Sequence, residues 1–380
     1  MKIINTERFP IKMWLDDIEE GALQQARNLA NLPFTFQWVA IMPDSHQGYG
    51  VPIGGVLATQ QVVIPNAVGV DIGCGMAAVK MSLKEIDTET IKGIMGDVRK
   101  VIPVGFNHHR HAQKWDKFDY APDIQIIQRE LNSARKQLGT LGGGNHFLEI
   151  QRGSDGSIWV MIHSGSRNFG LKTAIEYHKK AQSLCERLAS DLPDKNLAFL
   201  PLDTVEGQEY LKAMNYCLNF AFANRALMMN RMVEIINKWT GATKQDEINI
   251  HHNYAAIEHH FGEKVLVHRK GATKASVGLR GIIPGSMGTK SYIVEGLGNT
   301  ESFESCSHGA GRLMSRKEAL HTLNLKTEQT KMAGIVHGLR TIRDLDEAPG
   351  AYKDIDVVME NQKDLVKATI ELTPLAVIKG

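Results

Sequence analysis

Short apolar segments beside glycine-containing loops recur along this chain of 380 residues, and they restrict its possible folds more than any other feature. Residues 36–42, 62–70, 78–83 and 157–162 are apolar or β-branched and are predicted to be strands. Between residues 247 and 311, further strands are expected to alternate with glycine loops. The 35 glycines have no fixed period, which excludes collagen-like and solenoid folds. They cluster beside histidines, so functional groups are expected in loops at strand ends.

Helical periodicity indicates that helices accompany these strands. Residues 17–32 and 205–239 place apolar residues at helical spacing, and residues 130–138 and 354–372 are also predicted to be helical. We interpret the apolar face of the longest helix as core packing and not as a cofactor site; it consists of Leu211, Met214, Leu218, Phe222, Met229, Met232 and Ile236.

These elements predict an α+β fold in which mixed β-sheets are flanked by helices, with the long helix outside a sheet. No linker rich in Pro, Gly and Ser divides the chain. Candidate ligands occur from residue 71 to residue 308, so one site would draw on most of the sequence. We therefore expect residues 1–380 to form a single domain with the site in a deep cleft.

Composition excludes several classes of protein. The chain is 43% hydrophobic and 23% charged, which is typical of globular proteins. No apolar run of about 18 residues is present, so no membrane partner is expected, and the N-terminus does not resemble a signal peptide. The four cysteines form no CxxC pair, which argues against a disulfide framework and for a cytoplasmic location. The net charge of +2 neither requires nor excludes nucleic acid.

Five residues stand at predicted strand ends, and the first four also have a glycine within two residues: Asp71, Cys74, His146, His163 and His252. Carboxylates favour hard ions such as Mn²⁺ and Mg²⁺, whereas imidazole and thiolate favour Zn²⁺, Co²⁺ or Fe²⁺. Such a mixed set can hold two ions bridged by the thiolate, which suits phosphoryl transfer. Each residue taken alone could instead be structural: a buried thiol, a core histidine or an aspartate in a turn.

Two further segments have the composition of anion-binding loops. Residues 284–291 are similar to a Walker A loop, but Thr289 stands where that motif needs a glycine before the lysine. His308 could attack phosphorus through a neutral ring nitrogen, and Arg312 could pair with phosphate oxygens. A simple turn and a structural histidine are the alternatives that the residues leave open.

Together these motifs resemble those of the RtcB family of RNA ligases over nearly the whole chain. The stretches that carry the resemblance are residues 43–46, 69–75, 144–147, 163–167, 251–254, 269–272, 284–287 and 307–311. The resemblance implies an enzyme that depends on GTP and Mn²⁺ and acts on broken RNA ends.

The resemblance also implies roles for individual residues. Two Mn²⁺ ions would be bound by Asp71, Cys74, His146, His163 and His252. His308 would attack the α-phosphorus of GTP. The nucleotide would be surrounded by Asn145, His146, Phe147, Leu148, Glu149, His252, Asn253, Pro284, Gly285, Ser286, Met287, Ser291, His308, Gly309, Ala310, Gly311 and Lys379. RNA would be contacted by Asp44, Arg167, Lys270 and Arg312, with Lys274, Arg280 and Lys290 as further candidates.

The implied reaction joins an RNA with a 2′,3′-cyclic phosphate or 3′-phosphate end to an RNA with a 5′-hydroxyl end. A cyclic end is first opened by water. Guanylate moves from GTP to His308 and then to the RNA 3′-phosphate, and attack by the 5′-hydroxyl expels GMP. This reaction serves tRNA splicing or RNA repair. The compact chain also resembles a branch of the family found beside a specialised peptide-release factor, which implies repair of ribosomal RNA.

The sequence departs from the family pattern between residues 83 and 138. Residues 107–123 lack periodicity and are predicted to be an irregular loop. Its basic residues either contact RNA phosphates or form a solvated loop; they are His108, His109, Arg110, His111 and Lys114. Gln47, Tyr49 and residues 167–170 are smaller departures, and none removes a predicted ligand or the nucleophile.

Two other functions remain compatible with the residues. A metal-dependent phosphohydrolase acting on cyclic-phosphate RNA ends would use the same five ligands without GTP. A non-catalytic binder of RNA ends or GTP would have no need of a thiolate-bridged metal pair. Ligand type does not separate Mn²⁺ from Zn²⁺ or Co²⁺, and the sequence leaves the oligomeric state open, a monomer included.

Overall fold

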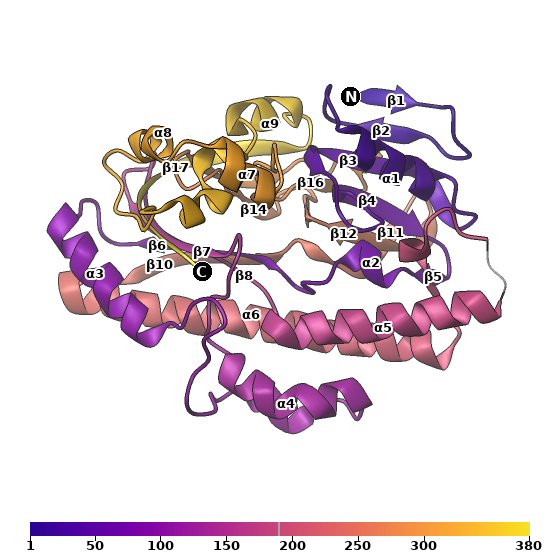
Figure 1. The fold of residues 1–380 in the computed structure, drawn as a ribbon, viewed down its shortest axis with the longest axis horizontal. Helices are drawn as coiled ribbons and strands as arrows, with labels where there is room; N and C mark the ends of the chain where they lie inside the picture. Colours follow the sequence, from indigo (N-terminus) through magenta and orange to yellow (C-terminus); the bar gives the residue numbers. More distant parts are fainter. Residues whose placement is uncertain (189–190) are drawn as a thin grey trace.

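The computed structural model describes residues 1–188 and 191–380. Two large β-sheets lie on one side of a pair of long helices (Figure 1). These helices, α5 (Arg167–Arg187) and α6 (Val205–Thr240), run side by side, and α4 (Gln125–Gln137) packs on α5 away from the sheets. The predicted α+β architecture of mixed sheets and flanking helices is confirmed.

The first sheet has six strands and is built mainly from the N-terminal part of the chain. In spatial order they are β1 (Lys2–Ile4), β2 (Ile11–Met13), β3 (Thr35–His46), β4 (Ile53–Thr59), β12 (Glu263–Lys270) and β11 (Asn253–His260). β2 and β3 are parallel, and the other neighbours are antiparallel. The predicted helix at 17–32 is α1 (Glu20–Ala30), which packs on β3. β3 continues past its predicted end because His46 still pairs with Ile53 of β4.

The second sheet has seven antiparallel strands. In spatial order they are β10 (Lys244–His251), β6 (Gly75–Met81), β8 (Ile158–Ser164), β7 (Phe147–Gly153), β17 (Val366–Lys379), β15 (Ser291–Gly296) and β14 (Arg280–Ile283). Helix α6 packs against β6, β8 and β10, and α3 (Thr88–Val101) packs against α6. The predicted position of the long helix on a face of a sheet is therefore confirmed.

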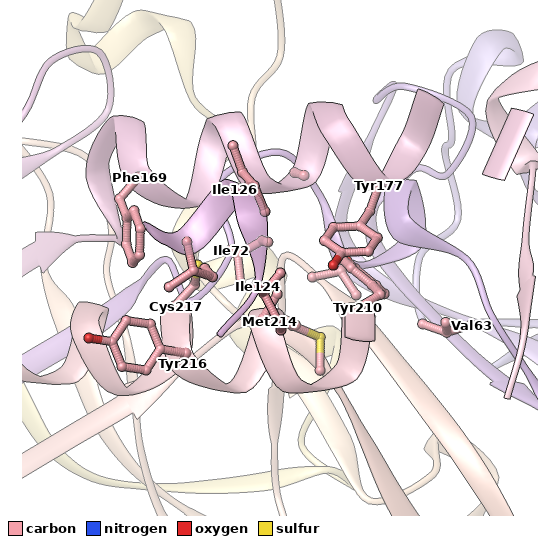
Figure 2. Close-up of a cluster of buried hydrophobic side chains, with 14 of the residues drawn as sticks. Val63, Ile72, Ile124, Ile126, Phe169, Tyr177, Tyr210, Met214, Tyr216 and Cys217 are labelled. Atoms are coloured by element: carbon pink, nitrogen blue, oxygen red, sulfur yellow. The ribbon is translucent and has the colours of Figure 1, made fainter. Parts of the chain in front are cut away.

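A buried aromatic cluster joins α4, α5 and α6 (Figure 2). The rings of Tyr177 and Tyr210 lie 5.2 Å apart, and Met214 is buried beside them. The methionines of α6 are thus core residues, as predicted. The assignment of Phe222 to this apolar face is wrong: its side chain is 46% exposed, because the helix turns the neighbouring Ala221 inward instead.

Two predicted elements are wrong in type. Residues 62–70 form only the short strand β5 (Val62–Val63) before Pro65 begins helix α2 (Pro65–Val68), since proline is favoured in the first helical turn. The helix predicted at 354–372 ends early: α9 (Ile355–Asn361) is followed by β17, because this segment pairs with β15 and β7. Pairing in a sheet overrides local helix propensity here.

The remaining elements are short. Two small sheets pair β5 with β9 (Leu200–Pro201) and β13 (Ala272–Lys274) with β16 (Ser305–Ser307). The other helices are η1 (Asp116–Tyr120), η2 (Lys195–Leu197), η3 (Thr300–Ser302), α7 (Arg316–Thr322), α8 (Leu325–Lys331), η4 (Ile342–Glu347) and η5 (Pro349–Ala351). Apart from η1, residues 107–123 are irregular, as predicted. Over the described part of the chain, no helix combines the length and apolar character needed to cross a bilayer.

Candidate active site

Four strands of the seven-stranded sheet meet at one edge and bring the predicted ligands together. Gly75, the first residue of β6, pairs with Ser164 at the end of β8 and with His251 at the end of β10. β7 begins beside the same end of β8. Because these neighbours are antiparallel, strand starts and strand ends alternate along one edge. The residues placed there are Cys74, His146, His163 and His252.

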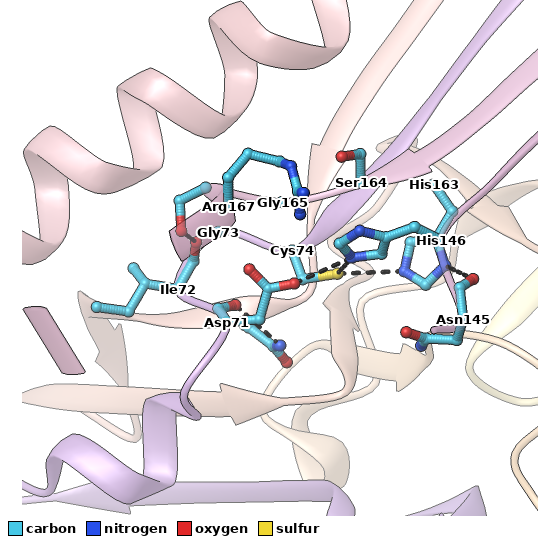
Figure 3. Close-up of polar contacts among 12 residues, drawn as sticks. Asp71, Ile72, Gly73, Cys74, Asn145, His146, His163, Ser164, Gly165 and Arg167 are labelled. Carbon is cyan, nitrogen blue, oxygen red and sulfur yellow. Dashed lines mark hydrogen bonds and ion pairs between the residues drawn. The ribbon is translucent and has the colours of Figure 1, made fainter. Parts of the chain in front are cut away.

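The five predicted metal ligands form two overlapping groups that share Cys74. Figure 3 shows four of them, Asp71, Cys74, His146 and His163. The sulfur of Cys74 lies 3.2 Å from Nε2 of His163 and 3.5 Å from Nε2 of His146. His146 Nε2 is also 3.0 Å from Oδ2 of Asp71, and His163 Nε2 is 3.3 Å from Nε2 of His252. The donor atoms of each group lie within 4.8 Å of one another, a spacing that suits one cation per group.

The imidazoles are oriented for metal binding. Nδ1 of His146 is 3.0 Å from the carbonyl oxygen of Leu141, and Nδ1 of His163 is 3.1 Å from that of Asn145. A carbonyl only accepts, so each Nδ1 carries the proton and each Nε2 offers its lone pair to the cluster. This arrangement fits a divalent cation bound by nitrogen, sulfur and carboxylate.

The electrostatics of the cluster agree with this fit. Burial lowers the pKa of His163 and of His252 well below the ordinary value, which keeps both rings neutral. Burial and the nearby charge of Asp71 raise the pKa of the Cys74 thiol well above its ordinary value. For Asp71, burial is outweighed by the hydrogen bond and charge that His146 supplies when Nε2 also carries a proton, so the pKa of Asp71 is lowered; a bound cation would take the place of that proton. A bound cation would displace the thiol proton and bind the thiolate.

Two polar residues of α6, Asn224 and Arg225, brace this edge and were missed by the sequence analysis. The buried guanidinium of Arg225 donates to the carbonyl oxygens of Gly73 and Ser164, each at 2.9 Å. These two residues directly adjoin Cys74 and His163 in sequence. Asn224 accepts from the backbone N–H groups of the turn at 139–140. The sequence feature that could have revealed them is a pair of adjacent polar residues on the buried face of a helix.

His308 lies beside the metal cluster, with its ring 4.7 Å from that of His252. Oδ2 of Asp44 is 2.6 Å from His308 Nδ1 and also accepts from the backbone N–H groups of His308 and Gly309. Asp44 is fully buried. This carboxylate holds Nδ1 protonated and leaves Nε2 as the ring nitrogen with a free lone pair. A Cβ at position 271 would lie 3.1 Å from the ring, so Gly271 leaves room for it.

Segments predicted to surround the nucleotide come together near His308. The 309 position packs on Pro284, and the backbone N–H of Gly285 donates to Oγ of Ser291. Gln151 lies 3.4 Å from that hydroxyl and donates to Glu149 at 2.7 Å. Burial raises the pKa of Glu149 to about 8. The stretches that meet here are residues 145–149, 284–291 and 308–311.

The side chain of Asn253 forms hydrogen bonds with backbone groups of the site. Its amide donates to the carbonyl oxygen of Asp71 and accepts from the N–H of Gly271. The side chain thus ties the metal-ligand loop to the loop beside His308. Its contact with a nucleotide stays a prediction.

Lys379 reaches a cluster around Glu347 that the sequence analysis missed. Its ammonium is 3.5 Å from the Glu347 carboxylate, which also accepts from Arg312 and Arg316 and from the hydroxyl of Tyr352. No local motif marks Glu347, so sequence offered no signal for it. Two residues with predicted roles, Lys379 and Arg312, are brought together by this carboxylate.

The residues predicted to contact RNA occupy different settings. Arg167, at φ +58°, donates to Thr140 and to the carbonyl oxygen of Gly105. Lys270 is buried, which lowers its pKa to about 7, and it donates to the carbonyl oxygen of Tyr49. The further candidates each pair with a carboxylate: Lys274 with Glu258, Arg280 with Asp246, and Lys290 with Asp356.

The fold and this site together are typical of a metal-dependent enzyme of phosphoryl transfer, in which a histidine held by a carboxylate stands beside residues that could bind a metal ion. The family model described as "tRNA-splicing ligase RtcB" matches residues 25–380. The "RNA-splicing ligase RtcB" of Escherichia coli strain K12 is 40% identical over 100% of this chain and 99% of its own length. The "tRNA-splicing ligase RtcB" of Pyrobaculum aerophilum is 31% identical over 98% of this chain and 95% of its own. The chain belongs to the RtcB family.

Proposed function

We propose that this protein is an RNA ligase of RNA repair or tRNA splicing, which joins 2′,3′-cyclic phosphate or 3′-phosphate ends to 5′-hydroxyl ends through GMP carried on His308. Family membership supports RNA ligation. The observation that carries the mechanism is the position of His308, held by Asp44 at 2.6 Å and set against the metal-ligand residue His252.

His308 acts as the nucleophile in this proposal. Asp44 accepts the Nδ1–H, so the lone pair of Nε2 attacks the α-phosphorus of GTP. The new bond joins Nε2 to phosphorus, and the bond to the bridging oxygen of pyrophosphate breaks. The ring becomes positively charged as this bond forms, and the buried Asp44 carboxylate stabilises that charge.

Asp71, Cys74, His146, His163 and His252 would hold two Mn²⁺ ions, which would supply positive charge to offset that of the phosphates. The two overlapping donor groups support two ions, and the mixed donor set agrees with a transition metal. The protein residues hold the cluster rigid through the backbone carbonyls that orient His146 and His163.

The nucleotide lies, in this proposal, between the glycine-rich loops on either side of His308. Pro284, Gly285, Ser286 and Met287 offer backbone and hydroxyl groups to phosphate oxygens. Lys379 supplies a positive charge, and Glu149 and Ser291 offer polar contacts to the guanosine. Asp44 is fully buried against His308, so we propose a positioning role for it in place of an RNA contact.

The later steps follow from the same geometry. The 3′-phosphate of the RNA attacks the GMP on His308, which returns the histidine to its starting form. The 5′-hydroxyl of the second RNA then attacks the activated end, and GMP leaves. We keep Arg167, Lys270 and Arg312 as proposed contacts to RNA phosphates, and each would have to exchange its present partner for a phosphate oxygen. We propose broken tRNA or ribosomal RNA as the substrate, and a competition between the two cleaved RNAs would separate them.

We further propose that residues 1–380 work as one domain in the cytoplasm. The site draws on both large sheets and on residues from Asp44 of β3 to Lys379 of β17. All four cysteines are free thiols, which agrees with a reducing compartment.

The test uses GTP labelled at the α-phosphate, with Mn²⁺, followed by denaturation of the protein. A phosphoramidate on histidine should be labile in acid and stable in base. The label should be absent from His308→Ala and present in the control His321→Ala, whose ring lies on the exposed helix α7. If no divalent metal supports an adduct, the proposal fails, and GTP-independent hydrolysis of cyclic phosphates becomes the function to test.

A further inference from the structure

One phenylalanine is fully exposed at the edge of the active site. Phe106 has 100% of its side chain accessible, in the segment where the sequence departs from the family pattern. It stands at the tip of a tight turn in which both the backbone N–H and the side-chain amide of Asn107 donate to the carbonyl oxygen of Val104. Gly105, at φ +63°, takes the left-handed conformation that the turn requires. The aromatic ring is therefore presented on an ordered backbone.

Two hydrogen bonds hold the turn next to the metal cluster. Gly105 donates to the carbonyl oxygen of Gly142 at 2.8 Å, and its own carbonyl accepts from Arg167 at 3.0 Å. Gly142 in turn lies against His146, since a Cβ there would sit 2.6 Å from the ring nitrogen Nδ1. One glycine loop therefore separates Phe106 from a metal-ligand residue.

The segment that follows Phe106 is basic. Arg110 and Lys114 are exposed cations, His108 and His111 are exposed imidazoles, and none of residues 105–115 is acidic. Nε2 of His109 lies 3.0 Å from a guanidinium nitrogen of Arg231 on α6, which donates to it. That bond fixes the loop on α6. A single aromatic ring among cations fits a nucleic acid strand better than it fits an apolar protein surface.

We propose that Phe106 stacks on an unpaired base next to the RNA end that is being joined. This inference rests on the proposed function, since it names how the RNA is held at that site. Every base has an aromatic face, so the contact would accept any sequence, and the basic residues beside it would meet the neighbouring phosphates. The ring is surrounded by water in the free protein. Stacking on a base would remove its apolar surface from water, which favours RNA binding.

The binding test uses the full chain with His308→Ala, so that RNA binds without being joined. The probe is an RNA with a short single-stranded 3′-phosphate end that carries 2-aminopurine, whose fluorescence is quenched on stacking. Phe106→Ala should weaken binding about 5- to 100-fold and reduce the quenching, because one base–aromatic stack is lost. Phe106→Trp should retain both, and thermal unfolding should confirm that each variant is folded.

Tyr120→Ala is the matched control, since Tyr120 is also an exposed aromatic, at 83%, but lies on η1. It should bind RNA as the parent does. Equal RNA binding by Phe106→Ala and its parent would overturn the proposal, and so would an equal loss in Tyr120→Ala. Failure of the proposed function is seen separately, as a missing GMP adduct on the protein that retains His308, because the binding assay needs neither GTP nor His308.

Discussion

Asp44 and His308 are 264 residues apart in the sequence, yet Oδ2 of Asp44 lies 2.6 Å from Nδ1 of His308 and accepts two backbone N–H groups as well. One buried carboxylate thus fixes the tautomer, the ring orientation and the loop of the proposed nucleophile. The contact links the fold directly to the proposed reaction, because it leaves Nε2 of His308 free to attack phosphorus.

Replacing Asp44 by Asn should reduce formation of the GMP adduct by about 10²- to 10⁴-fold. The neutral amide neither stabilises a charged imidazole ring nor holds the required tautomer. Labelled GTP measures the rate, and thermal unfolding shows whether the variant is folded. The control is Asp155→Asn, which removes a carboxylate 2.8 Å from Lys80, away from His308, and should form adduct normally. A normal rate in Asp44→Asn would exclude the assigned role.

Replacing Cys74 by Ser should weaken both proposed metal positions, because the thiol belongs to both donor groups. Titration with Mn²⁺ should show fewer than two bound ions. With Co²⁺ in place of Mn²⁺, the thiolate-to-metal absorption band of the parent should vanish. Cys217→Ser is the matched control, since that thiol is buried beside Thr173, and it should keep the band. An unchanged band in Cys74→Ser would remove the bridging thiolate from the mechanism.

Replacing Arg225 by Met should lower Mn²⁺ affinity about 10- to 100-fold, the usual effect of losing support behind metal ligands. The carbonyl oxygens of Gly73 and Ser164 would lose their donors, and the loops that carry Cys74 and His163 would loosen. Arg225→Lys keeps a charge and fewer donors, so an intermediate loss is expected. Calorimetric titration with Mn²⁺ gives the affinities, and parent-like binding by the Met variant would contradict the role.

Glu258 and Arg269 form a buried ion pair that should govern stability in acid. Burial opposes ionisation of Glu258, but the hydrogen bonds and charge of Arg269 outweigh it and lower the pKa to about 2. The pKa of Glu258 in the folded state lies below the ordinary 4.5. The stability that the ionised carboxylate contributes is therefore complete above about pH 4.5 and is lost as the pH falls toward 2.

Glu258→Gln should therefore reduce the free energy of unfolding at pH 7 by about 3 kcal/mol, since the Arg269 charge stays buried without a partner. The difference from the parent should shrink between pH 4.5 and pH 2. Urea unfolding at several pH values measures it, with the exposed Glu263→Gln as control. A constant difference across this range would show that the pair does not set the acid sensitivity.

The sequence by itself determined which chemical groups the site contains. Cys74, His146 and His163 stand beside glycines at strand ends, and both features are local, so they can be read before the chain is folded. Helical periodicity likewise predicted α6, because a repeat of apolar residues reports on one face of one element. Each of these inferences depends on residues close together in the chain.

Only the tertiary structure decided how these groups act on one another. The register of β6, β8 and β10 brings the ligand residues to one edge, and the loop after β16 places His308 against Asp44. Arg225 and Glu347 had no local motif, and the chain after α9 became the strand β17 because sheet partners were available. Contacts between residues hundreds of positions apart depend on strand register and on shared burial, which no local pattern in the sequence specifies.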